Sequence, residues 1–584
     1  MANETTEMIH LKINGIPVEV PKGSTILQAA KAVHIEIPTL CYLKDINCIG
    51  ACRICVVEVT GRRGLLAACV YPAEEGMEVY TNTPTVRKSR KTTLELLLSE
   101  HKKKCLSCER VEVCELQRLA HAYGTDEDRF DTADDIQYPI DDLSPYVVRD
   151  NNKCIDCLRC VAACKNVQGV SVIGPINRGF KKHIGSAFDM SLNDAPCVGC
   201  GQCIVACPVG ALKEKSSEQK VWDALADPNK KVVFFTAPSV RATLGEAFNM
   251  PIGTNVEGKM VAAIRRLGAD QVFNMDVTAD LTIMEEANEL IERIKGGKTL
   301  PMFTSCCPGW VKFCEHYYPD FLPHLSTCKS PQQMFGAVLK SYYCEKNGID
   351  PKDLFVVSVI PCTAKKFEVT REEQRSGDFD DVDVALTTRE LARMIKQSAI
   401  DFTALEDEKW DDPFETATGG GAIFGATGGV MEAALRTAAT ILDGSCEAVE
   451  FKEVRGTQGI KEASYTIAGT EVKVAVASGL ANARKIVEQV KNGEKDYMFV
   501  EIMACPGGCI NGGGQPYQPD SVLNYVDVKT IRAKALYDLD TELPIRRSHE
   551  SPVMKMLYDD YFEAPGKEKA HKLLHTTYVE RGTH

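Results

Sequence analysis

The segment EIMACPGGCINGGGQP (residues 501–516) contains the pattern that decides the architecture of the C-terminal part of this chain. A β-like run, DYMFVEIM (496–503), leads into it, and two cysteines and the glycines at 507, 508 and 512–514 follow. Glycine lets a backbone approach a bulky group closely because it has no Cβ atom. The segment therefore predicts a strand that ends in a cofactor-binding loop.

Two other segments have the same form, with cysteine beside proline after a β-like run. They are TSCCPGW (304–310) and IPCTAKKFE (360–368). Ligands of open α/β sheets bind at the carboxyl ends of the strands, so the three loops are expected to converge. Four thiolates would then meet, as many as a 4Fe–4S cluster needs. They are those of Cys307, Cys362, Cys505 and Cys509.

Short β-like runs and helical stretches alternate from about residue 217 onward. The runs are 231–236, 271–275, 355–360, 472–477 and 496–503, and the helical candidates include 281–294, 332–343 and 482–492. This alternation predicts an α/β fold. The stretch GGGAIFGATGG (419–429) lacks the G-x-G-x-x-G spacing and follows no clear strand, so it does not predict a dinucleotide site.

One cysteine spacing, C-x2-C-x2-C-x3-C, occurs twice upstream of this region, which indicates an internal duplication. Its members are Cys154, Cys157, Cys160 and Cys164, and then Cys197, Cys200, Cys203 and Cys207, with Pro208 next. This spacing is typical of bacterial ferredoxins with two 4Fe–4S clusters, in which the fourth cysteine binds the other cluster. Cys207 is therefore expected to complete the first cluster and Cys164 the second. A zinc site is the disfavoured alternative.

Two further ligand groups precede this duplication. Cys41, Cys52, Cys55 and Cys69 suit a 2Fe–2S cluster, with zinc as the alternative and Cys48 as a bystander. They follow LKINGIPVEV (11–20), which predicts a hairpin around Asn14-Gly15. His101, Cys105, Cys108 and Cys114 suit zinc or a 4Fe–4S cluster. Zinc is favoured for this group alone, but the neighbouring groups reverse that preference. Several clusters in one chain predict an electron-transfer path.

The composition limits the function further. A chain of 584 residues is too long for one core, and we expect domains at 1–84, 85–133, 134–216 and 217–584. The net charge of -13 argues against nucleic acid as the main partner. The first ten residues lack the pattern of a signal peptide, and no run of about 18 apolar residues spans a bilayer. A cytoplasmic location is expected, in which 25 cysteines indicate metal ligands.

The three cysteine loops resemble the signature motifs of iron–iron hydrogenases, and the resemblance covers nearly the whole chain, including the four upstream groups in order. It implies an N-terminal β-grasp 2Fe–2S domain, a small 4Fe–4S domain, a ferredoxin-like domain with two 4Fe–4S clusters and a C-terminal α/β hydrogenase domain. The implied reaction is 2 H⁺ + 2 e⁻ ⇌ H₂. The implied H-cluster is a 4Fe–4S cube on Cys307, Cys362 and Cys505 that shares Cys509 with a two-iron subcluster carrying carbon monoxide, cyanide and a bridging dithiolate.

The resemblance also assigns roles to single residues. Lys365 is similar to the lysine that binds one cyanide, and Ala237, Pro238 and Ser239 to the segment around the other. Gln332, Met503 and Phe424 are similar to pocket residues, although their types alone favour plain packing. Cys306 resembles a proton-relay cysteine, a role that suits an unperturbed thiol pKa of about 8.5. Glu286, Ser326, Glu289 and Arg293 match the family's route to solvent, but three of them alone suggest a solvated helix face.

One position departs from the family pattern. The family commonly has methionine just before the second motif's Pro-Cys, and this chain has Ile360. Isoleucine is branched and lacks a thioether. We expect an altered catalytic bias, overpotential or inhibitor sensitivity, with activity retained.

Two rival functions and several partners follow from the same residues. Residues 1–215 alone would suit an electron-transfer subunit, and a hydrogen sensor would keep the fold. Sensory relatives tend to lose the relay cysteine, which is present here as Cys306. The expected partners are ferredoxin, or flavin- and NAD-binding subunits, because GACRICVVEV (50–59) resembles domains of such complexes, together with maturation proteins that insert the two-iron subcluster. The isolated Cys314, Cys328, Cys344 and Cys446 are expected to be buried.

Overall fold

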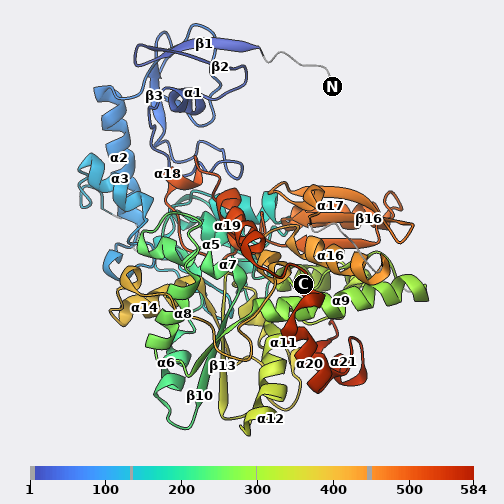
Figure 1. Ribbon diagram of the computed structural model, residues 1–584. Coiled ribbons are helices and arrows are strands. Elements are labelled where there is room, and N and C mark those ends of the chain that lie inside the picture. The colour runs from blue at the N-terminus through green and yellow to red at the C-terminus, as the bar shows by residue number, and fades with distance from the viewer. Residues whose placement is uncertain (1–6, 132–135, 298, 444–449, 584) are drawn as a thin grey trace.

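The computed structural model describes residues 7–131, 136–297, 299–443 and 450–583. Its N-terminal domain is a five-stranded sheet of order β2-β1-β5-β3-β4, packed against α1 (Ile26–Ala32) (Figure 1). The strands are β1 (Met8–Ile13), β2 (Ile16–Pro21), β3 (Val56–Val59), β4 (Leu66–Ala67) and β5 (Glu78–Tyr80). Asn14 and Gly15 both have positive φ, as a two-residue hairpin turn requires, so the predicted hairpin is confirmed.

A pair of helices connects this domain to the rest of the molecule. They are α2 (Pro84–Glu100) and α3 (Glu115–Tyr123), which lie side by side in Figure 1. Thr83 caps α2 by accepting from the amide of Val86, and Pro84 occupies the first turn, where its missing N–H costs nothing. All four ligand candidates of the second group lie in the connection between the two helices, residues 101–114.

The duplicated cysteine segments form a small domain with approximate internal symmetry. Strands β6 (Val147–Arg149) and β9 (Leu212–Glu214) pair antiparallel, as do β7 (Gly174–Ile176) and β8 (His183–Gly185). Each cysteine segment turns into a short helix, α4 (Arg159–Ala162) or α5 (Gln202–Ala206). A residue in the left-handed region begins each helix, Leu158 at φ 60° and Gly201 at φ 68°. The two halves thus repeat the same local conformation, as the repeated spacing predicts.

The C-terminal part contains a four-stranded parallel sheet of order β11-β10-β13-β14. Its strands are β10 (Lys231–Thr236), β11 (Gln271–Asn274), β13 (Leu354–Ile360) and β14 (Val384–Thr387). They are buried on both faces, which explains why the runs are almost continuously apolar. The first three match the predicted runs, whereas β14 is short and was not predicted.

A second four-stranded sheet has the order β12-β17-β16-β15. Strands β12 (Met302–Phe303), β17 (Phe499–Met503) and β16 (Thr470–Ser478) are parallel, and β15 (Ile460–Ile467) lies antiparallel at the edge. Helix α9 (Asp276–Gly296) is longer than the predicted 281–294, and α11 (Pro331–Val338) continues into a π-helical turn, η8 (Leu339–Tyr343). Helix α17 (Leu480–Lys491) matches its prediction. The α/β prediction for this region is confirmed.

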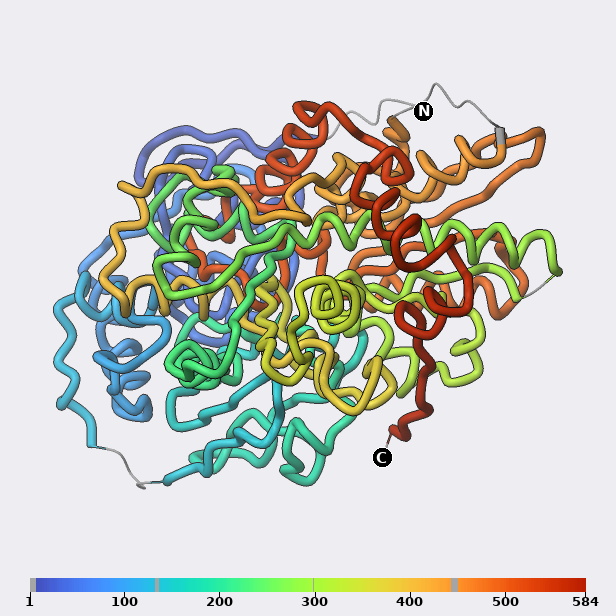
Figure 2. Tube along the Cα trace, turned by 60° about the horizontal axis from the view of Figure 1, so that its bottom comes forward, coloured from blue at the N-terminus to red at the C-terminus, as the bar shows by residue number. Residues whose placement is uncertain are grey.

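The C-terminal segment packs across the part of the molecule that contains the two four-stranded sheets. It forms α19 (Val528–Glu542), α20 (Pro552–Leu557), the π-helical η15 (Tyr558–Phe562) and α21 (Glu568–Leu574). Helix α20 contacts α9 and α21 contacts α11, and Figure 2 shows the red segment crossing the light-green part of the chain. The amide of Lys329 donates to the carbonyl of Leu574, and the amide of Thr576 donates to the carbonyl of Thr327, both at 2.8 Å. These bonds fix residues 574–576 beside the 327–329 segment.

Two sequence expectations concern the chain as a whole. None of the helices in the described ranges combines the length and the hydropathy needed to cross a bilayer. Cys314, Cys328 and Cys344 are buried, as predicted, and Cys446 lies outside the described residues.

Candidate metal centre

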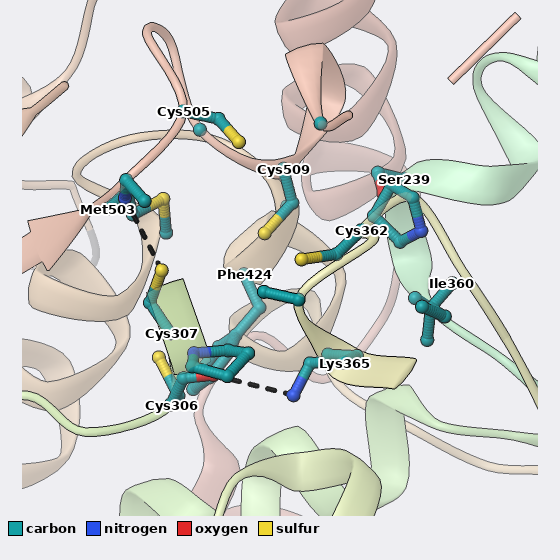
Figure 3. Close-up of a pocket in the computed structure, with 18 of the residues that line it drawn as sticks. Ser239, Cys306, Cys307, Ile360, Cys362, Lys365, Phe424, Met503, Cys505 and Cys509 are labelled. Carbon is teal, nitrogen blue, oxygen red and sulfur yellow. Dashed lines mark hydrogen bonds between the residues drawn. The ribbon is translucent and has the colours of Figure 1, made fainter. Parts of the chain in front are cut away.

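The three predicted cysteine loops meet at one cavity. They follow β12 and β17 of one sheet and β13 of the other, so the carboxyl ends of strands from both sheets face the same space. Figure 3 shows the sulfur atoms of Cys307, Cys362, Cys505 and Cys509 around it. Cys307 Sγ also accepts the amide of Ala504 at 3.3 Å, which connects the first loop to the third.

Two glycines allow the third loop to approach its neighbours. Gly508 has φ 100°, and a Cβ atom there would lie 2.6 Å from the amide nitrogen of Thr427. A Cβ atom on Gly513 would lie 2.5 Å from the carbonyl oxygen of Cys200 and 2.6 Å from the Cα atom of Gly201. Both distances are too short for any side chain. The ACPGGC segment therefore needs glycine for backbone contact with the protein itself, as well as around a bound group.

Burial disfavours the ionised form of these thiols. It raises the pKa of Cys362 to about 12 and also raises the pKa of Cys307, Cys505 and Cys509. Four such thiols become stable thiolates when cations share the cavity, because coordination to iron removes the proton outright. The donor set therefore fits an iron–sulfur group held by these four residues.

Lys365 brings a buried cation to the same cavity. Its Nζ atom donates to Ser330 Oγ and to Glu368 Oε2, both at 2.8 Å, and to the carbonyl of Cys306 at 3.5 Å. Burial opposes its charge, but the neighbouring Glu368 carboxylate raises the pKa of Lys365. A charged ammonium that lines a cavity suits an anionic ligand.

Most of the other predicted pocket residues also line this cavity. Ala237, Pro238 and Ser239 lie at the turn from β10 into α7 (Pro238–Arg241), and Phe424, Met503 and the unusual Ile360 also contribute to the lining. Gln332 does not lie among these residues. Its side-chain nitrogen donates to Glu368 Oε2 at 2.9 Å, and its side-chain oxygen accepts from Ser358 Oγ at 2.8 Å. It thus supports the carboxylate that pairs with Lys365.

Of the predicted proton-relay residues, Glu286, Glu289 and Arg293 lie on α9, and Cys306 and Ser326 lie in loops. Cys306 lines the cavity, and burial followed by the nearby Glu286 raises the pKa of its thiol. Glu286 is buried, and burial with the Glu289 charge raises its pKa to about 8. Ser326 lies close enough to offset this shift in part, and its hydroxyl donates to Glu289 Oε2 at 2.9 Å. Glu289 Oε1 accepts from Arg293 at 2.6 Å.

The ferredoxin-like cysteines line two separate small cavities. Cys154, Cys157 and Cys160 share the first with Cys207, and Cys197, Cys200 and Cys203 share the second with Cys164. Each fourth cysteine therefore lies with the other segment, which is the crossed arrangement that the spacing predicts. Cys200 also lines the central cavity. The second small cavity and the central one thus share a wall.

The two N-terminal ligand groups, within residues 41–69 and 101–114, lie farther along the chain from the loops of the central cavity. The amides of Cys41 and Cys52 each approach the other residue's sulfur, at 3.4 and 3.5 Å, and Cys55 Sγ lies 3.3 Å from Cys69 Sγ. Cys48 is exposed and donates to the carbonyl of Cys69 instead.

In the second group, His101 caps the end of α2, Cys105 begins a short 3₁₀ turn that Cys108 follows, and Cys114 is the N-cap of α3. His101 Nδ1 is buried and has no hydrogen-bond partner in the described part of the chain, as suits a ligand atom.

Comparisons with known proteins agree with this geometry. Residues 230–513 match the profile of the iron only hydrogenase large subunit, C-terminal domain, and residues 526–581 match the iron hydrogenase small subunit. Residues 6–84 match a 2Fe-2S iron-sulfur cluster binding domain. Residues 90–129 match the NADH-ubiquinone oxidoreductase-G iron-sulfur binding region, and residues 144–213 match the ferredoxin-like domain of NADH-quinone oxidoreductase subunit 3.

A full-length relative decides the family. The chain is 48% identical to the NADP-reducing hydrogenase subunit HndD of Solidesulfovibrio fructosivorans, over 98% of this chain and 99% of that one. This chain belongs to the FeFe hydrogenase family. It is also 45% identical to iron hydrogenase 1 of Clostridium pasteurianum, over 97% and 99% of the two chains. A solved variant of the FeFe hydrogenase HydA1 from Chlamydomonas reinhardtii matches with a TM-score of 0.56 and 40% identity, over 62% of this chain and 99% of that one.

Some features around the central cavity were not predicted from the sequence. Glu368, which pairs with Lys365, stands three residues after it on one short helix, so the spacing contained a usable signal. The contact between Gly201 and Gly513 had no such signal, because it joins two loops far apart in the chain. The Thr363 hydroxyl donates to the carbonyl of Gly199 at 2.6 Å and strengthens the same junction.

Proposed function

We propose that Cys307, Cys362, Cys505 and Cys509 hold the H-cluster of this hydrogenase, with Cys509 shared between the cube and a two-iron subcluster. The main support is that four buried thiols, the relay candidate Cys306 and the cation of Lys365 line one cavity. When bound, the subcluster supplies the redox chemistry of 2 H⁺ + 2 e⁻ ⇌ H₂, and the protein supplies binding, orientation and protons.

The carbonyl, cyanide and dithiolate groups of the subcluster belong to the same proposal. Lys365 is charged and buried, so it suits one cyanide. Ser239, in the first turn of α7, suits the other, because its hydroxyl is buried and has no hydrogen-bond partner in the described part of the chain. Phe424, Met503 and Ile360 would exclude water beside the subcluster.

Protons would reach the cavity through chain residues. Glu286 has its pKa raised to about 8 by burial, so it is neutral at pH 7 and able to give a proton to Cys306. Ser326 and Glu289 would resupply Glu286 from the outer side. Cys306 then presents its S–H to the bound group, without being needed as a ligand of the cube.

Electrons would pass through one 2Fe–2S and three 4Fe–4S clusters. The proposed domain boundaries are 1–84, 85–133, 134–216 and 217–584. In the ferredoxin-like domain the order is the cluster on Cys154, Cys157, Cys160 and Cys207, then the one on Cys197, Cys200, Cys203 and Cys164. Cys200 lines both the second small cavity and the central one, so that cluster is the immediate donor to the H-cluster.

The electron partner is proposed to be a subunit that binds flavin and NAD or NADP, with ferredoxin as a second carrier. The support is the full-length similarity to a subunit of an NADP-reducing hydrogenase, including the N-terminal cluster domains. Maturation proteins would insert the subcluster. Purification from the native host, followed by identification of the chains that co-purify, tests this assignment. Recovery of the chain alone, with turnover supported by ferredoxin only, would contradict it. The cytoplasmic location remains a prediction of the sequence.

A hydrogen sensor with little turnover is the alternative, and the presence of Cys306 beside Cys307 disfavours it. The deciding experiment measures hydrogen evolution from reduced dye by protein whose infrared spectrum contains the carbonyl and cyanide bands of a complete cofactor. We expect turnover in the usual enzyme range, above about 1 s⁻¹. A complete set of bands without hydrogen evolution would reject the catalytic assignment.

A further inference from the structure

A chain of hydrogen bonds continues from Glu289 into the C-terminal segment. Glu289 Oε2 accepts from Ser326 Oγ at 2.9 Å and from Thr327 Oγ1 at 3.2 Å. Thr327 Oγ1 lies 2.7 Å from His575 Nδ1, and His575 Nε2 lies 3.2 Å from Glu285 Oε2. The imidazole is thus connected through one hydroxyl to the carboxylate at the outer end of the proposed proton route.

Arg293, the last residue of that route, is poorly suited to pass a proton. Its guanidinium donates to Glu289 and to the carbonyls of Thr299, Pro323 and Leu325, and its side chain is only 7% exposed. Arginine stays protonated in proteins and has no acceptor atom. Arg293 therefore holds Glu289 in place, and the proton needs another path from Glu289 to water.

His575 has the geometry of a proton carrier. Its two ring nitrogens face different partners, and imidazole is able to take a proton at one nitrogen while it releases one from the other. The side chain is 6% exposed, and the exposed ring of His571 stacks on it with a centroid distance of 4.5 Å and an interplanar angle of 9°. The imidazole thus lies one side chain below the surface.

The groups around His575 come from three parts of the fold. Glu285 and Glu289 face it from α9, and Cys328 pairs with it through the backbone from the 327–329 segment. From η15, Tyr558 reaches the network by donating to Glu285 Oε1 at 2.6 Å.

A metal site is the other interpretation, because donor atoms of Glu289, Cys328 and His575 all lie within 4.8 Å of one another. Both imidazole nitrogens and both Glu289 oxygens already have hydrogen-bond partners, which favours a proton path over a metal site.

We propose that Thr327 and His575 form the outer part of the proton route, so that the C-terminal segment takes part in catalysis. For an inward transfer, His575 Nε2 takes a proton that arrives through the Glu285 carboxyl, the partner of that nitrogen, and Nδ1 gives one to Thr327 Oγ1. The hydroxyl passes its own proton to Glu289 Oε2, so each group gains and loses one proton. This inference rests on the route through Cys306 and Glu286 proposed above.

The hydroxyl link is tested by Thr327→Val, which keeps the shape and the backbone amide that also donates to Glu289. Hydrogen evolution from reduced dye should fall at least about tenfold, as for the loss of a general acid–base group. The solvent deuterium isotope effect should rise, because proton delivery becomes rate-limiting. Thr327→Ser restores the hydroxyl and should restore both values. Equal losses in the Val and Ser variants would mean a structural role and overturn the proposal.

The imidazole is tested by His575→Asn, whose amide keeps a partner for Thr327 but does not titrate. His549→Asn, a half-buried histidine outside this network, is the matched control. We expect His575→Asn to slow turnover, to raise the isotope effect and to change the pH profile, while the control behaves as the parent protein does. Infrared bands of the cofactor and dye reduction of the accessory clusters should be unchanged in both.

The outcomes separate this inference from the function on which it rests. One outcome is that Glu286→Gln evolves hydrogen slowly, while Thr327→Val and His575→Asn keep the rate, pH profile and isotope effect of the parent protein. In that case only the outer path is wrong. If Glu286→Gln is itself as fast as the parent protein, the inner route fails and this extension fails with it.

Discussion

The ferredoxin-like cysteines and the cysteines of the central cavity assemble in different ways. The former come from two compact segments, 154–164 and 197–207, and each segment supplies three cysteines of one set and the fourth cysteine of the other. The latter come from three loops between residues 307 and 509, and two sheets bring them together. Cluster ligation in the first region thus depends on local spacing, and in the second on the packing of the whole domain.

Loss of a cavity ligand should have the largest effect. Cys505→Ala removes a thiolate from a buried site that no nearby local segment can replace, so we expect hydrogen evolution to disappear and the carbonyl and cyanide bands to be absent. The matched change is Cys344→Ala, which removes a buried thiol remote from any cluster group and should leave both signals. Normal infrared carbonyl and cyanide bands in Cys505→Ala would contradict the claim that ligation in the central cavity depends on all four cysteines.

Glu286→Gln should come next, with an effect on both activity and pH dependence. Turnover should fall by about 10²-fold or more, because the amide does not carry protons. The folded-state pKa of Glu286 is raised to about 8 from its ordinary value of 4.5, so the native state binds more protons than the unfolded state between these values. Stability of the parent protein therefore falls as pH rises through this window.

The Gln variant lacks that loss, so its unfolding temperature relative to the parent should be higher at pH 8 than at pH 5. Thermal denaturation of both proteins at the two pH values checks the sign. A difference that does not depend on pH would show that Glu286 stays ionised in the fold.

Gly513→Ala tests the junction between the two regions. The added Cβ atom would lie 2.5 Å from the carbonyl oxygen of Cys200, so the loops must separate at a cost of roughly 1–3 kcal/mol. We expect a lower unfolding temperature and slower transfer from the accessory clusters to the H-cluster. Gly174→Ala is the control, because its Cβ atom meets nothing within 4 Å. Equal behaviour of the two variants would contradict a tight junction.

Ile360→Met should have the smallest effect. Ile360 is buried and lines the cavity, so a thioether placed there would alter the surroundings of the subcluster without touching a ligand. We expect activity to persist, with a change in the ratio of hydrogen production to uptake, in overpotential or in inhibition by carbon monoxide. Film electrochemistry measures all three. The role assigned to this position is wrong if none of them changes.

The sequence predicts the ferredoxin-like domain more completely than the central cavity. The crossed cysteine sets and the strands β10 and β13 follow from spacing and apolar runs, because local pattern determines them. The strands β12, β14 and β15 were not predicted. β12 has only two residues, which is too few for periodicity, and β15 alternates between exposed and buried residues at the edge of its sheet. The convergence of the three loops followed from sheet geometry, but Gln332 proved to support Glu368 instead of lining the cavity.

The sequence did not predict the residues that continue the proton route beyond Glu289, because they come together only through tertiary packing. His575 meets Thr327 only because residues 574–576 pair with the 327–329 segment across nearly the whole length of the catalytic part. The sequence of the tail, 552–576, predicts only a helical segment with aromatic and basic residues, and its polar side chains acquire partners only in the tertiary structure. Functional groups that act through distant pairing leave no local signal.

Hydrogen evolution by Cys306→Ala, beside Cys314→Ala as a buried-cysteine control, tests the central claim most directly. The claim is that the central cavity combines a metal anchor with a proton donor that is not itself a ligand. Both variants should show the infrared bands of a complete cofactor. We predict that Cys306→Ala loses at least about 10²-fold of its turnover while Cys314→Ala keeps the parent rate. Parent-like turnover in Cys306→Ala, with the same complete bands, would contradict the account.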